Sequence, residues 1–97
     1  MLKISTETSA AMLVLVLEGS LSGPWVREVE SVWLRTTLDR KPGSVRVDLS
    51  DVTFVSDEGK RWLEQICVSG AEIVSSDLAT KALADELMRK HRRIGNR

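Results

Sequence analysis

The sequence of 97 residues is poor in the side chains that carry catalysis or cross-linking, with one cysteine, one histidine and no tyrosine. A single cysteine forms no internal disulfide, and no Cys/His cluster exists to hold zinc. His91 lies in a basic segment, so we expect no Ser-His-Asp or Cys-His catalytic arrangement. Cys67 falls on the apolar face of a predicted helix, which favours a buried, unreactive thiol.

Long apolar runs and nucleotide-binding loops are also missing. The longest apolar run, Ala10 to Leu17, has eight residues, whereas a membrane helix needs about 20. Residues 1–5 lack the basic and apolar regions of a signal peptide. Neither GxGxxG nor GxxxxGK[ST] occurs, so no glycine-rich phosphate loop is present. We therefore expect a cytoplasmic protein with no cofactor, no bound metal and no membrane insertion.

Charge of one sign is not in excess, because 14 Lys and Arg balance 14 Asp and Glu. This balance argues against direct DNA binding through a bulk basic field. The charges are uneven, with five of the basic residues and His91 within residues 89–97. We therefore divide the chain into a domain, 1–88, and a basic C-terminal tail, 89–97. The tail either places favourable charge at a frayed helix end or contacts an acidic protein, RNA or anionic lipid.

Hydrophobic periodicity predicts an α/β domain of order β-β-α-β-α-β-α. We expect strands at residues 2–5, 11–17, 44–49 and 71–74, and helices from 25 to a stop at 41–43, from 59 to 68, and from a cap at 76 or 77 to 95. The strand at 11–17 is expected to be buried on both faces. Helical crossovers imply a mixed, largely parallel four-stranded sheet with helices packed on it. Trp25, Trp33 and Trp62 fall at helical core spacing, which favours packing over a stacking platform for a ligand.

The most informative segment is 48–59, which carries Asp48, Asp51, Asp57 and Glu58 where a predicted parallel strand leads into a helix. Ligand sites of open α/β sheets lie at this edge. The carboxylates could simply favour the helix N-terminus, by about 0.5–2 kcal/mol. A Mg²⁺ or phosphoryl-acceptor site would need a further acidic pair, and the loop from Ser20 to Pro24 has no carboxylate. We therefore predict that the chain is not an enzyme.

Residues 45–63 resemble the signature of the STAS family, the sulfate transporter and anti-sigma factor antagonist domain. That signature is an alternating strand ending in Asp, then Val-x-Phe/Tyr, an apolar residue, Asp-Ser-Ser/Thr-Gly and an amphipathic helix. Here it reads Val45-Arg46-Val47-Asp48-Leu49-Ser50, Val52-Thr53-Phe54-Val55-Ser56-Asp57-Glu58-Gly59 and Trp62-Leu63. Leu17-Glu18-Gly19-Ser20-Leu21 is similar to the family's Gly-x-Leu turn. The resemblance covers about residues 2–88.

The resemblance implies a phosphorylation site that this sequence has changed. In regulated members a partner kinase phosphorylates the first Ser after the Asp, and the matching position is Asp57. Ser56 and Glu58 replace its two neighbours, and Ser22 replaces an acidic residue common after Gly-x-Leu. We expect no phosphorylation switch at this position, whether Asp57 mimics phosphoserine or marks loss of the switch. The family also adds a last strand and helix, for which no room remains after Leu87, so we expect a sheet edge that is exposed or left for a partner.

The implied function is a non-enzymatic, protein-binding regulatory domain in bacterial signalling, resembling an anti-sigma factor antagonist and acting in transcription regulation. The expected partner is an anti-sigma factor or switch kinase. The alternative is an accessory STAS subunit of an ABC-type membrane transporter, which would contact the transporter ATPase. The predicted partner-binding residues are Ser22, Gly23, Pro24, Ser56, Asp57 and Glu58.

Overall fold

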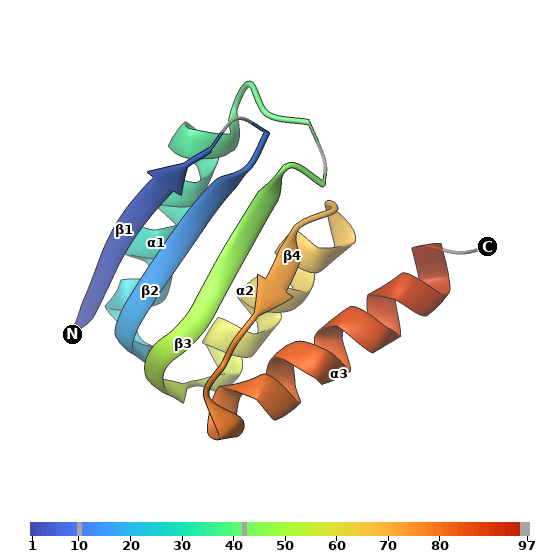
Figure 1. Cartoon of the computed structure of the whole chain (residues 1–97). Coiled ribbons are helices and arrows are strands. Elements are labelled where there is room, and N and C mark those ends of the chain that lie inside the picture. The colour runs from blue at the N-terminus through green and yellow to red at the C-terminus, as the bar shows by residue number, and fades with distance from the viewer. Residues whose placement is uncertain (10, 42, 96–97) are drawn as a thin grey trace.

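The computed structural model of the chain describes the backbone of residues 1–9, 11–41 and 43–95, and side chains as far as Lys90. The element order is β-β-α-β-α-β-α, as predicted (Figure 1). The elements are β1 (Leu2–Thr8), β2 (Leu13–Leu21), α1 (Pro24–Thr37), β3 (Val45–Val55), α2 (Asp57–Val68), β4 (Glu72–Val74) and α3 (Leu78–Gly95).

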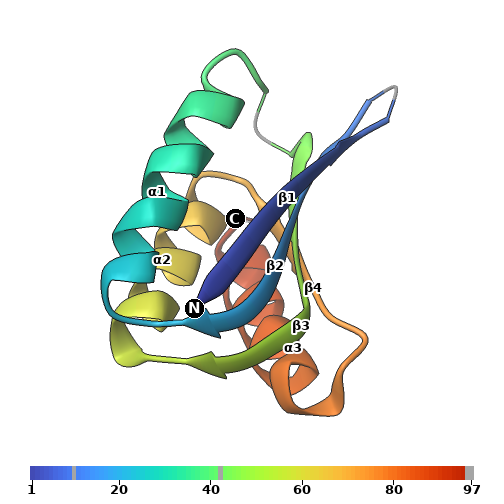
Figure 2. The same cartoon turned by 90° about the vertical axis from the view of Figure 1, so that its left-hand side faces the viewer.

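The four strands form one mixed sheet in the order β1-β2-β3-β4. β1 pairs antiparallel with β2, whereas β2 with β3 and β3 with β4 are parallel. This confirms the predicted, largely parallel four-stranded sheet. Figures 1 and 2 show α1 and α2 lying against the same face of the sheet, with α3 beside β4. The N-termini of α1 and α2 therefore meet the sheet at one edge, where β2 and β3 end.

The core lies between this sheet face and the helices. Alternate residues of β2 and β3 point into it, among them Leu15, Leu17, Val47 and Leu49. The prediction that residues 11–17 are buried on both faces was wrong, because the intervening side chains of β2 are only partly buried. Because side chains alternate along a strand, they point to the opposite face of the sheet. α1 and α2 leave that face uncovered (Figure 2). The Leu- and Val-rich run of residues 13–17 therefore belongs to a strand with one buried face.

β3 and α2 both differ in length from their predictions. The predicted strand 44–49 and the apolar residues after it form one strand of 11 residues. Two register irregularities interrupt its pairing with β2, between Val16 and Glu18 and between Gly19 and Ser20. These irregularities disturb the period of two, which made the second half of β3 look like a connection. α2 begins at Asp57, two residues before the predicted start.

α3 covers the outer edge of β4. Asp77 caps the helix, because its Oδ2 accepts hydrogen bonds from the N–H groups of Ala79 and Thr80 at 3.1 and 3.3 Å. The N–H of Ile73 points at the Sδ atom of Met88, 3.4 Å away. The expectation of an edge that is exposed or left for a partner is therefore corrected for β4, since α3 occupies that position (Figure 1).

The backbone of α3 continues without interruption to Gly95. The division between a domain, 1–88, and a tail, 89–97, stays a prediction. Within the tail, Lys90 Nζ lies 3.0 Å from Glu64 Oε2 on α2, whereas the side chains of residues 91–97, His91 included, lie outside the described part. Within the described part, no helix combines the length and the apolar character that crossing a membrane requires.

Candidate docking edge

The two loops predicted to bind a partner meet at one edge of the sheet. The N–H of Ser56, after β3, donates to the carbonyl oxygen of Leu21, at the end of β2, over 3.0 Å. The Ser56 hydroxyl points at the same oxygen, 3.4 Å away. These contacts bring together six residues that we call the docking edge: Ser22, Gly23, Pro24, Ser56, Asp57 and Glu58.

Gly59 lets the two loops approach this closely. A Cβ atom at this buried position would lie 2.7 Å from the carbonyl oxygen of Leu21, well inside contact distance. The absence of a side chain therefore allows the first turn of α2 to sit directly on the end of β2. Gly59 belongs to the STAS-like motif of residues 45–63, but its steric role depends on the neighbouring strand and cannot be seen in the motif alone.

At the α2 side of the docking edge, Ser56 is the capping residue. Its Oγ accepts a hydrogen bond of 3.1 Å from the N–H of Gly59. Asp57 and Glu58 follow in the first turn and are both exposed. The two carboxylates therefore favour α2 through the positive end of its dipole, while the hydrogen bond of the cap belongs to Ser56.

Among the residues that the structure describes, no side chain caps the α1 side of the docking edge. Gly23 is the N-cap residue at φ 56°, a left-handed conformation that suits glycine, and Pro24 begins the helix. The neighbouring Ser22 does not cap α1, because its hydroxyl shares a hydrogen bond of 2.6 Å with the Ser20 hydroxyl. The Gly23 and Pro24 side of the edge is exposed, so a partner would meet main chain and a proline ring here.

The carboxylates of segment 48–59, which raised the question of a metal site, do not come together in the structure. Asp48 Oδ1 accepts hydrogen bonds from the N–H and the hydroxyl of Ser50, at 2.9 and 2.6 Å. Asp51 and Asp57 are exposed on β3 and α2. Across the described residues, no group of three or more His, Cys, Asp or Glu side chains is placed to hold a metal ion.

Cys67 and the tryptophans have the packing roles predicted for them. The side chain of Cys67 is 7% exposed, and burial raises the pKa of its thiol from 9.0 to about 11, with the negative charge of Glu64 adding to the effect. Trp62 is buried, whereas Trp25 and Trp33 are partly buried against the core. The rings of Trp33 and Trp62 meet edge to face, with centroids 6.0 Å apart.

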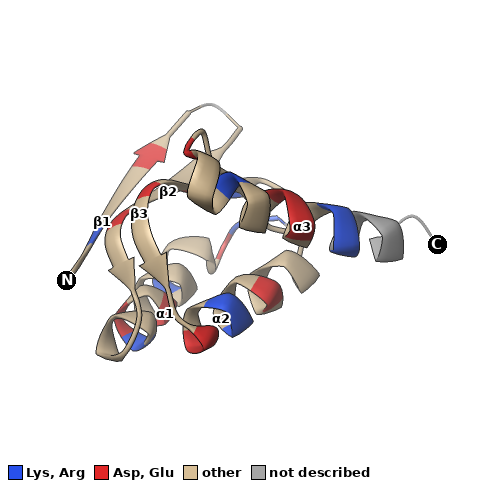
Figure 3. Cartoon of the chain, turned by 90° about the horizontal axis from the view of Figure 1, so that it is seen from below, with Lys and Arg blue, Asp and Glu red and all other residues tan. Residues whose placement is uncertain are grey.

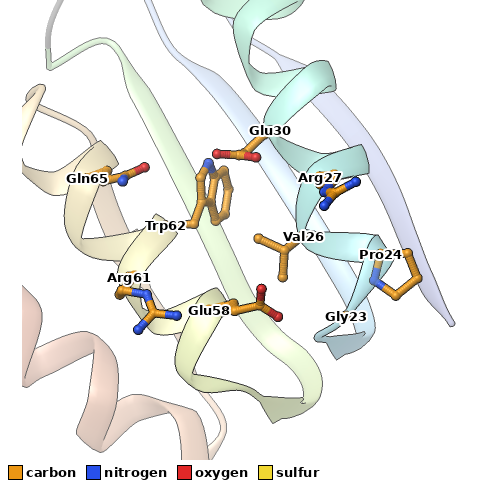
Figure 4. A pocket seen from close by; sticks show the side chains of 9 residues that line it. All are labelled: Gly23, Pro24, Val26, Arg27, Glu30, Glu58, Arg61, Trp62 and Gln65. Carbon is orange, nitrogen blue, oxygen red and sulfur yellow. The ribbon is translucent and has the colours of Figure 1, made fainter.

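A groove between α1 and α2 opens beside the docking edge and was not predicted. Its first section is a cavity of about 510 Å³ that includes Gly23, Pro24 and Glu58 of the edge. Figure 4 shows the lining residues, which come from both helices: Gly23, Pro24, Val26, Arg27, Glu30, Glu58, Arg61, Trp62 and Gln65. The sequence contains one sign of this groove, because each helix carries an Arg and a Glu three residues apart. That spacing places the two charges on one face of their helix, but it does not show that the charged faces of the two helices meet.

No family model matches the sequence, and no curated protein matches it. Among solved structures, the chain is similar to an uncharacterized protein of the DUF3478 family from Shewanella loihica PV-4, which is described as having a SpoIIAA-like fold. The TM-score is 0.62 at 10% sequence identity, over 92% of this chain and 79% of that one. The fold is SpoIIAA-like.

A SpoIIAA-like fold is STAS-like, so the structure supports the fold that residues 45–63 suggested. At 10% identity the likeness shows the fold alone. The docking edge in this SpoIIAA-like fold is formed where β2 and β3 pass into α1 and α2. Its function must be argued from the residues at that edge.

Proposed function

We propose that this SpoIIAA-like chain is a non-enzymatic, protein-binding regulatory domain that resembles an anti-sigma factor antagonist. It would act in the cytoplasm of a bacterium, where it binds an anti-sigma factor or switch kinase through the docking edge. The observation that carries the proposal is the pairing of the two loops, because Ser56 bonds to Leu21 over 3.0 Å. A partner can therefore contact both loops on one surface.

The chemistry of the edge favours binding that is not switched by phosphorylation. Position 57 carries an exposed carboxylate in place of a hydroxyl. The neighbouring Ser56 hydroxyl is already engaged with the N–H of Gly59 and the oxygen of Leu21. A phosphate on Ser56 would break this cap and face the charges of Asp57 and Glu58. We therefore propose a constitutive interaction that depends on Asp57.

Affinity capture from the native cell tests this proposal, with the wild-type chain beside Asp57→Ala and Asp57→Ser. Asp85→Ala is the matched control, because Asp85 is an exposed carboxylate on α3, away from the docking edge. We expect the wild type and the control to capture a protein with an ATPase fold, and Asp57→Ala to capture less of it.

Capture of a transporter ATPase would instead indicate an accessory STAS subunit of an ABC-type membrane transporter. Capture of neither kind of protein, or binding that Asp57→Ala leaves unchanged, would contradict the docking proposal. Purified Asp57→Ser, incubated with the captured partner and ATP, then shows whether a hydroxyl at this position restores phosphorylation.

A further inference from the structure

The groove beside the docking edge runs along the full length of α1 and α2. Three cavities of about 510, 170 and 150 Å³ follow one another between the helices. The first two share Glu30, Trp62 and Gln65, and the last two share Trp33 and Ser69. α1 has 14 residues, which corresponds to about 21 Å of helix. We call this continuous feature the α1–α2 groove.

The middle of the α1–α2 groove is apolar. Trp62 and Ile66 of α2 are buried at its base, and Trp33 of α1 packs edge to face against Trp62. Leu34 lines the same section and is 67% exposed, so its side chain is available on the wall of the groove. A groove between two helices with an exposed leucine on its wall fits the apolar stripe of a third helix.

The two ends of the groove differ in charge. Arg27, Glu30, Glu58 and Arg61 line the end next to the docking edge (Figure 4). Within the described part of the chain, none of these four forms an ion pair. At the far end, beyond Trp33, two of the eight lining residues are basic, Arg40 and Lys41, and none is acidic. An elongated partner would therefore meet mixed charge at one end and positive charge at the other.

We infer that the α1–α2 groove binds an amphipathic helix of the partner protein whose first turn is acidic. Its apolar stripe packs on Trp33 and Leu34, and its acidic turn lies against Arg40 and Lys41. Acidic residues stabilise a helix at its N-terminus, so this helix runs antiparallel to α1 and α2. Its negative C-terminal end then lies at the positive N-termini of α1 and α2. The inference rests on the proposed protein-binding function and names the segment that the partner supplies.

A synthetic helix tests the inference without the native partner. The probe is a fluorescein-labelled peptide of about 14 residues, to match α1, with Leu at i, i+3, i+4 and i+7 and Glu in its first turn. A second peptide carries Lys in place of Glu, and a third has the same composition with the Leu stripe scrambled. Anisotropy titrations with the full chain should show binding of the Glu peptide about ten-fold tighter than the Lys peptide, and no saturable binding of the scrambled peptide.

Matched variants locate the binding. Leu34→Asp should weaken binding of the Glu peptide about ten-fold, whereas Leu78→Asp should leave the affinity for this peptide unchanged. Leu78 is the same residue type, 87% exposed, but lies on α3 away from the groove. Arg40→Glu combined with Lys41→Glu should reverse the preference between the Glu and Lys peptides. Both Leu34 and Leu78 are exposed, so circular dichroism should show an unchanged fold in each variant.

Three results would overturn the inference: no binding of the Glu peptide, equal binding of the three peptides, or equal effects of Leu34→Asp and Leu78→Asp. These results are independent of affinity capture. Peptide binding in the groove without an Asp57-dependent partner would reject the docking edge alone. An Asp57-dependent partner without peptide binding would reject the groove alone.

Discussion

Ser56 serves both loops of the docking edge, because its backbone N–H bonds to Leu21 and its hydroxyl accepts from Gly59. The neighbouring Asp57 is exposed, so it is available to a partner and contributes little to the fold. The segment that contains both residues could be recognised from the sequence. The division of roles could not, since it depends on where the end of β2 lies relative to the first turn of α2.

We predict that Ser56→Ala lowers the free energy of unfolding by about 1 kcal/mol, because α2 loses its cap. The matched change Asp57→Ala removes only a favourable charge at the helix dipole, and should cost about 0.3–1 kcal/mol at low salt and less at high salt. Urea denaturation of both variants measures the difference. A larger loss for Asp57→Ala at high salt would show that Asp57, and not Ser56, holds the helix terminus.

Cys67 gives the chain a pH dependence in the alkaline range. Its folded pKa is raised to about 11, above the ordinary value of 9.0, so between these values the unfolded chain releases a proton that the folded chain keeps. Stability from this group is fully present below pH 9 and falls as the pH rises toward 11, by up to about 1.4 kcal/mol per unit.

Cys67→Ala is the comparison that isolates this effect. Denaturation at several pH values from 8 to 11 should show a steeper fall in unfolding free energy for the wild type than for the variant. Equal slopes would mean that the thiol has an ordinary pKa in the folded state.

At the scale of elements, α3 is held by a hydroxyl network at its first turn. Thr80 is 6% exposed, and its Oγ1 donates to the carbonyl oxygen of Leu49 over 3.1 Å and lies 2.6 Å from Ser75 Oγ. The N–H and hydroxyl of Ser76 donate to Ser50 Oγ at 2.9 and 3.0 Å. These contacts fix the start of α3 to the middle of β3 and to the segment that follows β4, and so hold it against the β4 edge.

We predict that Thr80→Val destabilises the chain by about 1–3 kcal/mol, because the buried oxygen of Leu49 loses its side-chain donor. Amide hydrogen exchange should also become faster at Ile73, whose N–H faces Met88 of α3. Thr53→Val is the matched control, since Thr53 is exposed on β3 and should tolerate the change. Unchanged exchange at Ile73 would show that α3 stays in place without this network.

The elements themselves could be predicted wherever the sequence kept a regular period. The alternation of residues 44–49 and the helical spacing after Trp25 and Gly59 identified three of them. The second half of β3 could not be predicted, because two register irregularities disturb its alternation. The α1–α2 groove could not be predicted either, since it exists only through the distance between two helices.

The whole molecule has one covered and one open face of the sheet. Figure 3, seen from below, shows α1 and α2 on one side of the strands and α3 projecting beyond them. On the open face, Arg46 pairs with Glu72 across β3 and β4 at 2.8 Å. Val14 and Val16 lie on this face. Their apolar character is the reason why the sequence predicted a strand buried on both faces. Element order could be predicted from the sequence, but which face stays open depends on the path of α3.

Charge is also divided along the molecule, because residues 89–97 hold five of the 14 basic groups. We predict that removing residues 91–97 leaves partner capture unchanged at physiological salt, where charges are screened over about 8 Å. At low salt the shortened chain should capture less of an acidic partner. This truncation keeps Lys90 and its contact with Glu64. A loss of capture that persists at high salt would show a direct, specific contact of the removed segment.

The position of α3 on the edge of β4 has a consequence for aggregation. Whenever α3 detaches by local unfolding, the N–H of Ile73 loses the Met88 side chain beside it. β4 then becomes an open edge strand with which a second chain could pair. β4 has only three residues, which keeps this exposed template short.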